Sequence, residues 1–258
     1  MTDQPLGRSV TVAIDHGLHW GSLEGFEDPA ALLDTVLDAG PDGILASVPF
    51  LKRFEDRIDA ADVHTIGTLD LLYDSTMPGD IENAEIHSQV FSVEDCADVA
   101  DAAKVALVFG RESPDVLKEN AEFVAAAAED CDDAGIPLIV EPTLWGQRAD
   151  DEFDTDYLVN ANRLGFELGA DILKTPYPPT GFERIVHNAP VPTYIAGGPA
   201  VETDREVLEM VHGAVEAGSQ GVMFGRNVWQ RDDPAAIIDA LSAIVHEGAT
   251  IEEAETLL

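Results

Sequence analysis

The chain has 258 residues, of which 45% are hydrophobic and 25% are charged, a balance typical of a soluble globular protein. Fifty acids against fourteen bases give a net charge of −36, which argues against nucleic acid or an anionic membrane as a partner. No stretch of about 18 apolar residues is present, so no transmembrane helix is expected. Residues 1–5 do not resemble the start of a secretory signal, and Cys96 and Cys131 fit buried positions in a reducing cytoplasm.

The acids are spread over nearly every part of the chain, as in 56–62 and 130–133, and are not gathered in one tail. Apolar runs lie between them, so disorder is a poor explanation. We therefore expect a protein adapted to a salt-rich cytoplasm, as in halophilic archaea. Calcium binding is the competing explanation, but the chain has no Asp-x-Asp-x-Asp-Gly loop.

Short apolar runs alternate with segments of helical spacing along the chain, and Gly, Pro or polar residues bound each run. Asp28-Pro29, Ser113-Pro114 and Asp233-Pro234 are typical helix starts, and Ser92 also fits a helix cap. The expected strands are 9–14, 43–47, 63–69, 105–109, 138–141, 171–175, 193–196 and 221–224, with a less clear strand at 85–90. The expected helices are 29–39, 113–133, 154–168, 203–217 and 233–246, with a further one beginning near 92.

Eight strands with helices between them predict a parallel sheet, and the continuous apolarity of the strands indicates burial on both faces. At this length a closed (β/α)8 barrel that forms one domain over residues 1–258 is the favoured architecture. An open doubly wound sheet is the alternative. It is disfavoured because no Gly-x-Gly-x-x-Gly follows the first strand.

Lys174 ends the apolar run Ile172-Leu173-Lys174 just before Pro176. Burial of an ammonium ion is costly and favours the neutral amine, which is a nucleophile toward carbonyls. The sequence thus allows a Schiff-base lysine or a strand-end lysine that reaches into solvent. The other three lysines, Lys52, Lys104 and Lys118, are expected in ordinary polar surroundings.

The last two expected strands end in residues suited to an anion. Gly197-Gly198 let backbone N–H groups approach a ligand closely, and Gly225-Arg226 add a guanidinium at a helix start. The loops after strands seven and eight are the usual phosphate site of this barrel. We therefore expect phosphate binding at these four residues, with a simple tight turn as the alternative for the glycine pair.

Asp15 closes the first strand and is expected near Lys174, where it would orient substrate hydroxyls or pair with the amine. A local hydrogen bond within its own loop is the structural alternative. His16 and His19 flank this position, and a metal site there would need a further ligand such as His64 or His87. Loop histidines are usually surface residues, so no metal is expected.

Four motifs together resemble the archaeal-type class I fructose-bisphosphate aldolases of the deoxyribose-phosphate aldolase superfamily. They are Asp15-His16-Gly17, Lys174-Thr175-x-Tyr177, Ala196-Gly197-Gly198-Pro199 and Gly225-Arg226-Asn227-Val228-Trp229-Gln230.

The resemblance implies a Schiff base without metal or cofactor, a phosphorylated ketose as substrate, and a ring-based homo-oligomer, often a decamer. It assigns the Schiff base to Lys174, the strand-one aspartate to Asp15, and phosphate binding to Gly197, Gly198, Gly225 and Arg226. His16 and Thr175 are expected as further pocket residues.

One departure from the family lies after strand five, where the aldolases carry an acid/base tyrosine. This chain has Val140-Glu141-Pro142-Thr143-Leu144-Trp145-Gly146 there. Glu141 is the preferred substitute and Tyr177 the alternative. The segment 181–186 is more similar to a related thiolase that acts on phosphorylated autoinducer-2. A third relative makes an aminodideoxyheptulosonate by transaldol transfer.

The reaction expected from these residues is cleavage and formation of fructose-1,6-bisphosphate. Acyl or transaldol transfer by the same lysine is the first alternative. A metal-dependent aldolase and a non-catalytic sugar-phosphate-binding barrel are the others.

The charge yields a test of salt adaptation. The melting temperature of the protein should rise strongly between low and molar potassium chloride, because the Debye length shrinks to about 3 Å and repulsion between the acids fades. Thermal unfolding followed by circular dichroism across the series measures this. A melting temperature that does not change with salt would contradict the proposed adaptation.

Overall fold

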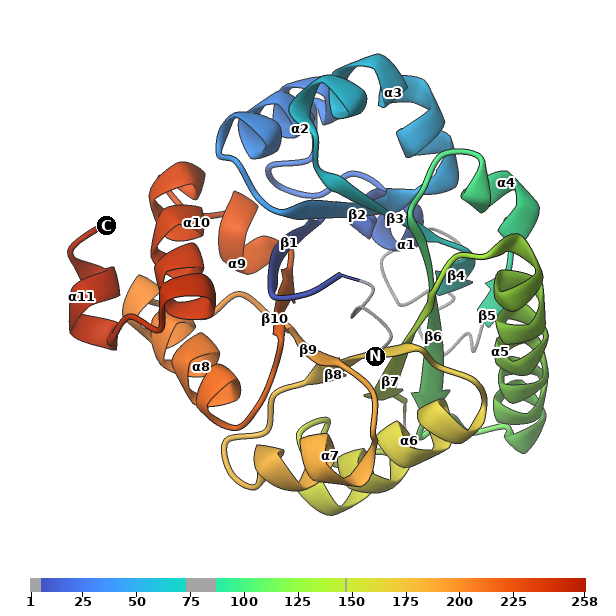
Figure 1. Cartoon of the computed structure of the whole chain (residues 1–258). Helices are drawn as coiled ribbons and strands as arrows, with labels where there is room; N and C mark the ends of the chain where they lie inside the picture. The colour runs from blue at the N-terminus through green and yellow to red at the C-terminus, as the bar shows by residue number, and fades with distance from the viewer. Residues whose placement is uncertain (1–5, 73–86, 147) are drawn as a thin grey trace.

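The computed structural model describes residues 6–72, 87–146 and 148–258. In these residues eight parallel strands close into a barrel with helices around it (Figure 1), in the order β1-β10-β9-β8-β7-β6-β3-β2. The predicted (β/α)8 barrel is confirmed. The barrel strands are β1 (Ser9–Ala13), β2 (Gly43–Ser47), β3 (His64–Thr68), β6 (Ala102–Phe109), β7 (Leu138–Leu144), β8 (Ile172–Pro176), β9 (Thr193–Ala196) and β10 (Gly221–Phe224).

Three of the helices begin at a cap followed by proline. Asp28, Ser113 and Asp233 each accept backbone hydrogen bonds in the first turn of their helix, and proline follows each of them. The helices are α1 (His16–Trp20), α2 (Pro29–Asp38), α3 (Val48–Ala61), α4 (Val93–Ala97), α5 (Pro114–Ala134), α6 (Thr155–Glu167), α7 (Phe182–Asn188), α8 (Asp204–Glu216), α9 (Arg226–Trp229), α10 (Pro234–Ser242), the π-helical turn η1 (Ala243–Glu247) and α11 (Ile251–Glu255).

One buried layer crosses the barrel interior, with a side chain from every strand. Because side chains alternate between the two faces of a strand, the residues on either side of each layer member point outward to the helices. On β6, for example, Ala102 belongs to the interior layer, while Ala103 and Val105 belong to the outer core. The layer consists of Ala13, Leu45, Ile66, Ala102, Ile139, Ile172, Tyr194 and Met223, with Leu6 packed against it.

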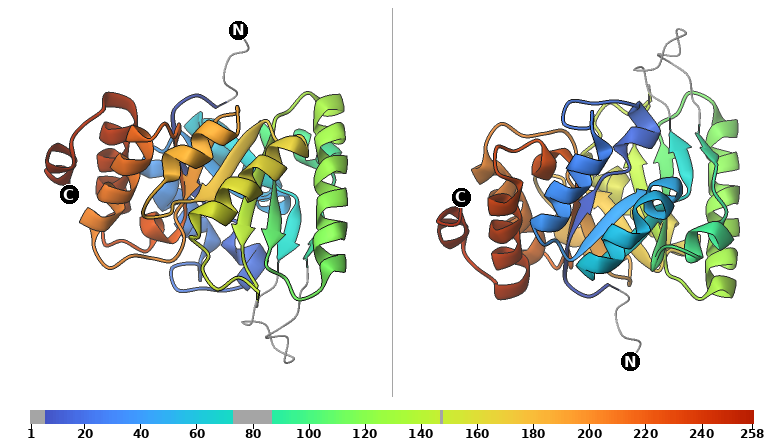
Figure 2. Two further views of the ribbon diagram at one scale, coloured as in Figure 1. Left: turned by 90° about the horizontal axis from the view of Figure 1, so that it is seen from below. Right: turned by 90° about the horizontal axis from the view of Figure 1, so that it is seen from above.

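Residues 6–8, which precede β1, lie at one end of the barrel (Figure 1), where Leu6 packs against the interior layer and the Tyr194 hydroxyl donates to the Gly7 carbonyl. The carboxyl terminus lies at the outer edge of the molecule (Figure 2), where α11 contacts α8 and α10. No helix in the described part of the chain is long and apolar enough to cross a membrane.

Three expectations about the strands need correction. The weak strand expected at 85–90 lies outside the barrel: β5 (His87–Gln89) pairs antiparallel with β4 (Asp70–Leu72), and 85–86 fall outside the described residues. Strand β6 begins at Ala102, three residues before the expected start, because Ala102 and Ala103 pair with neighbouring strands. Strand β7 likewise continues beyond Glu141 to Leu144.

Candidate active site

A cavity of about 610 Å³ opens at the carboxyl ends of the barrel strands. Its centre is built by the residues that stand two positions beyond the interior layer on their strands. Since the side-chain period of a strand is two, these residues also point inward, one level closer to the mouth. They include Asp15 after β1, Thr68 on β3, Lys104 on β6, Glu141 on β7 and Lys174 on β8.

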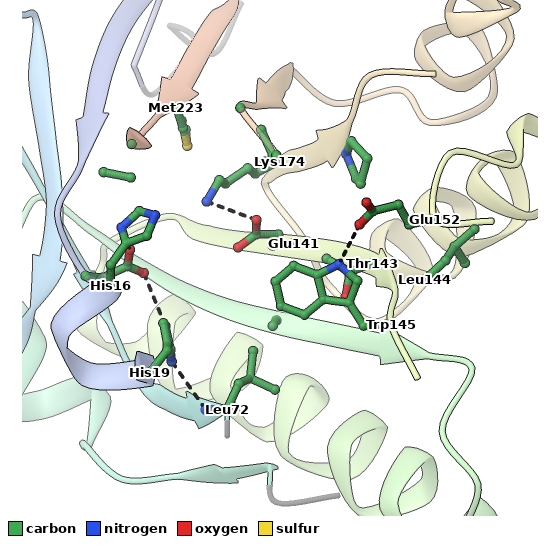
Figure 3. Close-up of a pocket in the computed structure, with 18 of the residues that line it drawn as sticks. His16, His19, Leu72, Glu141, Thr143, Leu144, Trp145, Glu152, Lys174 and Met223 are labelled. Carbon is green, nitrogen blue, oxygen red and sulfur yellow. Dashed lines mark hydrogen bonds and ion pairs between the residues drawn. The ribbon is translucent and has the colours of Figure 1, made fainter. Parts of the chain in front are cut away.

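Lys174 and Glu141 point toward one another at the centre of the cavity (Figure 3), with Lys174 Nζ 3.0 Å from Glu141 Oε1. The other carboxylate oxygen, Oε2, lies 2.8 Å from Lys104 Nζ. The Lys174 side chain is only 6% exposed and lines the cavity, so it does not reach into bulk solvent. The nucleophile candidate is therefore buried beside a group able to accept its proton.

Lys104 corrects the expectation of ordinary polar surroundings. It is 2% exposed and also lies 3.9 Å from Asp15 Oδ2. Burial alone would lower the pKa of Lys104, but the charges of Glu141, Asp70 and Asp15 outweigh it and raise the pKa above its usual value. Lys104 therefore stays an ammonium ion, which leaves Lys174 as the amine that can react.

Asp15 lies between polar side chains from several elements. The Thr68 hydroxyl donates to its Oδ2 at 3.2 Å, and His19 Nε2 lies 3.5 Å from the same oxygen. Burial by itself raises the pKa of Asp15, but the adjacent His19 and the charges of Lys104 and Lys174 bring that pKa well below its usual value. Asp15 is thus an anion at the edge of the cavity, as its predicted role requires.

His19 was considered only as a metal ligand, and the structure shows another arrangement. The backbone N–H of Leu72 on β4 donates to His19 Nδ1 at 3.3 Å. In neutral His19 the ring proton is then on Nε2, the nitrogen that faces Asp15. Leu72, on a strand outside the barrel, thus orients the His19 ring, which contacts Asp15 at the end of β1.

No group of three or more His, Cys, Asp and Glu suited to a metal occurs in the described ranges. His64 lies far from the mouth at the start of β3, and His87 pairs with Asp70, with Nε2 2.8 Å from Oδ2.

The four predicted phosphate residues, Gly197, Gly198, Gly225 and Arg226, all line one side of the cavity. The Arg226 guanidinium donates to the Gly198 carbonyl at 3.1 Å, and its centre lies 5.0 Å from the Trp20 ring centroid.

Two of the glycines are required by local geometry. Gly198 has a φ of 61°, and a Cβ on Gly225 would collide with the His16 ring. We call Gly197, Gly198, Gly225 and Arg226 the cradle.

Two predicted site residues lie elsewhere. Thr175 points outward from β8, where its hydroxyl accepts a hydrogen bond from Asn162 on α6 at 2.8 Å. Tyr177 packs against Phe182, with its hydroxyl beside Gly213 on α8. Because Lys174 and Pro176 occupy the inward positions of β8, the alternating residues 175 and 177 face the helices. This placement counts against Thr175 as a pocket residue and Tyr177 as an acid/base.

Several lining residues were not singled out from the sequence. Lys104 was missed because the strand was expected to begin one residue after it. Thr143, two positions beyond Glu141, lines the cavity, and its buried hydroxyl has no hydrogen-bond partner among the described residues. Trp145 and Arg111 line the side opposite the cradle.

A buried lysine that is paired with a carboxylate and lines an open cavity is the arrangement expected of a Schiff-base-forming barrel enzyme. The family model described as DeoC/LacD family aldolase matches residues 9–231, and the chain belongs to this family. The predicted class I aldolase, which works through a lysine Schiff base without a cofactor, is confirmed, and the non-catalytic alternative is wrong.

The chain is 33% identical over 259 residues to an uncharacterized aldolase of Saccharolobus solfataricus. The alignment covers 98% of this chain and 94% of that protein. It is 31% identical over 263 residues to the class 1 fructose-bisphosphate aldolase of Halobacterium salinarum, with coverage of 98% and 97%.

A solved archaeal fructose-1,6-bisphosphate aldolase, with its catalytic lysine bound to the carbinolamine intermediate, superposes with a TM-score of 0.81 at 28% identity. The match covers 93% of this chain and 94% of that one.

His16 provides a pH test of the site. Burial lowers the pKa of His16 to about 4, although Asp15 opposes the shift. In the unfolded chain His16 titrates near its usual value of about 6.5, so between the two values only the unfolded state binds the proton. The free energy of unfolding should therefore fall as the pH is lowered from about 6.5 toward 4.

Denaturant unfolding in molar salt at a series of pH values measures this slope. His16→Asn should show a smaller loss between pH 6.5 and about 5.5, a window in which most carboxylates stay ionised. Equal slopes for the two proteins would contradict the assigned burial of His16.

Proposed function

We propose that this chain is a class I aldolase that cleaves and forms a carbon–carbon bond in a phosphorylated ketose, with Lys174 as the Schiff-base residue. The observation that carries the proposal is the buried Lys174 Nζ, 3.0 Å from Glu141 and in one cavity with the cradle. Fructose-1,6-bisphosphate is the first substrate to test, because relatives that match nearly the whole chain act on it by name.

In the proposed reaction Lys174 passes a proton to Glu141 and attacks the ketone carbon. Loss of water from the resulting carbinolamine leaves an iminium ion. The bond between the carbon next to the iminium carbon and the hydroxyl-bearing carbon beyond it then breaks, and its electrons form an enamine. A base takes the proton of the substrate hydroxyl, and an aldehyde leaves. The enamine on Lys174 then takes up a proton at carbon, and water hydrolyses the iminium ion to release the second product.

The surrounding residues support this sequence in distinct ways. Glu141 replaces the family tyrosine as acid and base, since it alone of the two candidates lies in the cavity. Burial raises the pKa of Glu141, but the charges of Lys104 and Lys174 outweigh burial and lower it, so Glu141 begins the cycle as an anion. Asp15 holds substrate hydroxyls, and phosphate in the cradle places the carbonyl over Lys174.

Transfer to a second acceptor uses the same lysine and stays the alternative. One observation supports this alternative: among the described residues no tyrosine lines the cavity, whereas the aldolases that the sequence resembles carry an acid/base tyrosine. Product analysis in the presence of coenzyme A or a second aldehyde separates transfer from cleavage. The cytoplasmic location of the protein and its assembly into a ring-based homo-oligomer stay predictions.

Borohydride trapping tests the nucleophile. Dihydroxyacetone phosphate, and separately fructose-1,6-bisphosphate, is incubated with the protein and borohydride, and intact mass and peptide mapping follow. The adduct should map to the Lys174 peptide and should be absent from Lys174→Met. Lys118→Met, an exposed control, should keep the adduct. An unmodified Lys174 peptide with both ketoses would overturn the proposal.

Glu141→Gln tests the acid/base role. The amide keeps the size of the side chain but cannot take a proton, so the turnover number should fall by roughly 10²- to 10⁴-fold. The exposed control Glu122→Gln, whose carboxylate lies 3.7 Å from Lys118 on the surface, should leave turnover unchanged. Turnover of Glu141→Gln within a few fold of the parent chain would assign the proton transfer to another group.

A further inference from the structure

The cavity extends from Lys174 away from the cradle to a second region, which we call the distal half: Leu72, Ala106, Leu144 and Trp145, from β4, β6 and β7 and the loop after it. We propose that the distal half receives an uncharged, apolar aldehyde, so that the ketose handled by this enzyme carries one phosphate and not two. The inference rests on the proposed function and narrows its substrate class.

The walls of the distal half are apolar. Leu72, Ala106 and Val108 form a buried hydrophobic cluster of their own, separate from the barrel interior and the outer core, and Trp145 packs against it. Figure 3 shows the Trp145 ring on the Leu72 side of the Lys174–Glu141 pair. A phosphate placed against these side chains loses its hydration without gaining hydrogen bonds, whereas an alkyl or aromatic group gains from burial.

The orientation of Trp145 brings a negative charge to the same region. Trp145 Nε1 donates to Glu152 Oε2 at 3.1 Å, and Glu152 is itself a lining residue (Figure 3). The hydrogen bond holds the indole in place as a flat apolar surface. A second phosphate there would meet the Glu152 carboxylate, and like charges repel strongly in a partly desolvated cavity.

Arg111 also lines the cavity, and it supplies the rival explanation. If Arg111 binds a second phosphate, the enzyme prefers a phosphorylated aldehyde. Gly146, another lining residue, lies beside Arg111, so the experiment below includes an Arg111 variant.

The aldol direction isolates the distal half, because the donor is the same in every assay. Dihydroxyacetone phosphate forms the enamine on Lys174, and the enamine carbon attacks the aldehyde carbon. One carbon–carbon bond forms, the aldehyde oxygen takes up a proton, and water hydrolyses the iminium ion to release the ketose phosphate. Only the acceptor then distinguishes one reaction from another.

The experiment compares kcat/KM for butanal and benzaldehyde with that for D-glyceraldehyde 3-phosphate, each with saturating dihydroxyacetone phosphate. At least one uncharged aldehyde should exceed the phosphorylated one by about tenfold or more. Leu72→Arg should shift the ratio toward D-glyceraldehyde 3-phosphate, and Arg111→Gln should change it by less than about threefold. A preference for D-glyceraldehyde 3-phosphate that is lost in Arg111→Gln would overturn the inference.

Borohydride trapping of dihydroxyacetone phosphate is measured for every variant, so that a misfolded variant is recognised. Failure of trapping in the parent chain would refute the proposed function itself. Trapping that succeeds while the phosphorylated aldehyde is preferred refutes the distal-half inference alone. Should Leu72→Arg not fold, Arg111→Gln and the acceptor ratio of the parent chain still decide the matter.

Discussion

The central constraint in this molecule is that two buried lysines share one buried carboxylate. Glu141 lies 3.0 Å from Lys174 and 2.8 Å from Lys104, and none of the three is more than 8% exposed. Ions in such a position are stable only when their partners are also charged. Asp15 and Asp70 complete the balance around Lys104, because their charges keep it protonated. Lys104 therefore remains a fixed positive charge, whereas Lys174 lies next to a proton acceptor.

The barrel explains why these groups meet. They come from strands that are distant in sequence, and each lies one inward position beyond a shared apolar layer. The layer is closed and rigid, so the level above it holds its charges at fixed separations. The helices also contribute, since the side chains that alternate with the site residues anchor the strands to them. Thr175, bonded to Asn162, is an example.

Charged residues are distributed differently on the surface and around the cavity. The surface carries the excess of acids that gives −36, whereas cations are concentrated around the cavity: Lys104, Lys174, Arg111 and Arg226 all line it. Four of the fourteen basic residues of the chain thus line one cavity, together with the acids Asp15, Glu141 and Glu152. The apolar distal half is a separate feature, made by β4 and the loop after β7.

The sequence by itself determined the barrel, most strand positions and the residues at the strand ends. Continuous apolar runs with caps between them allow few other architectures, and Lys174, Asp15, Glu141 and the cradle all follow from reading strand ends. It did not determine which way each side chain faces. A shift of one residue along a strand exchanges the inside and the outside.

For this reason Lys104 was expected in ordinary polar surroundings, and Thr175 and Tyr177 were predicted as site residues although they face the helices. Only the tertiary structure settled these positions, because the register between neighbouring strands fixes which residues share a level. The same holds for His19, since its partner Leu72 comes from a hairpin whose place beside the barrel depends on packing.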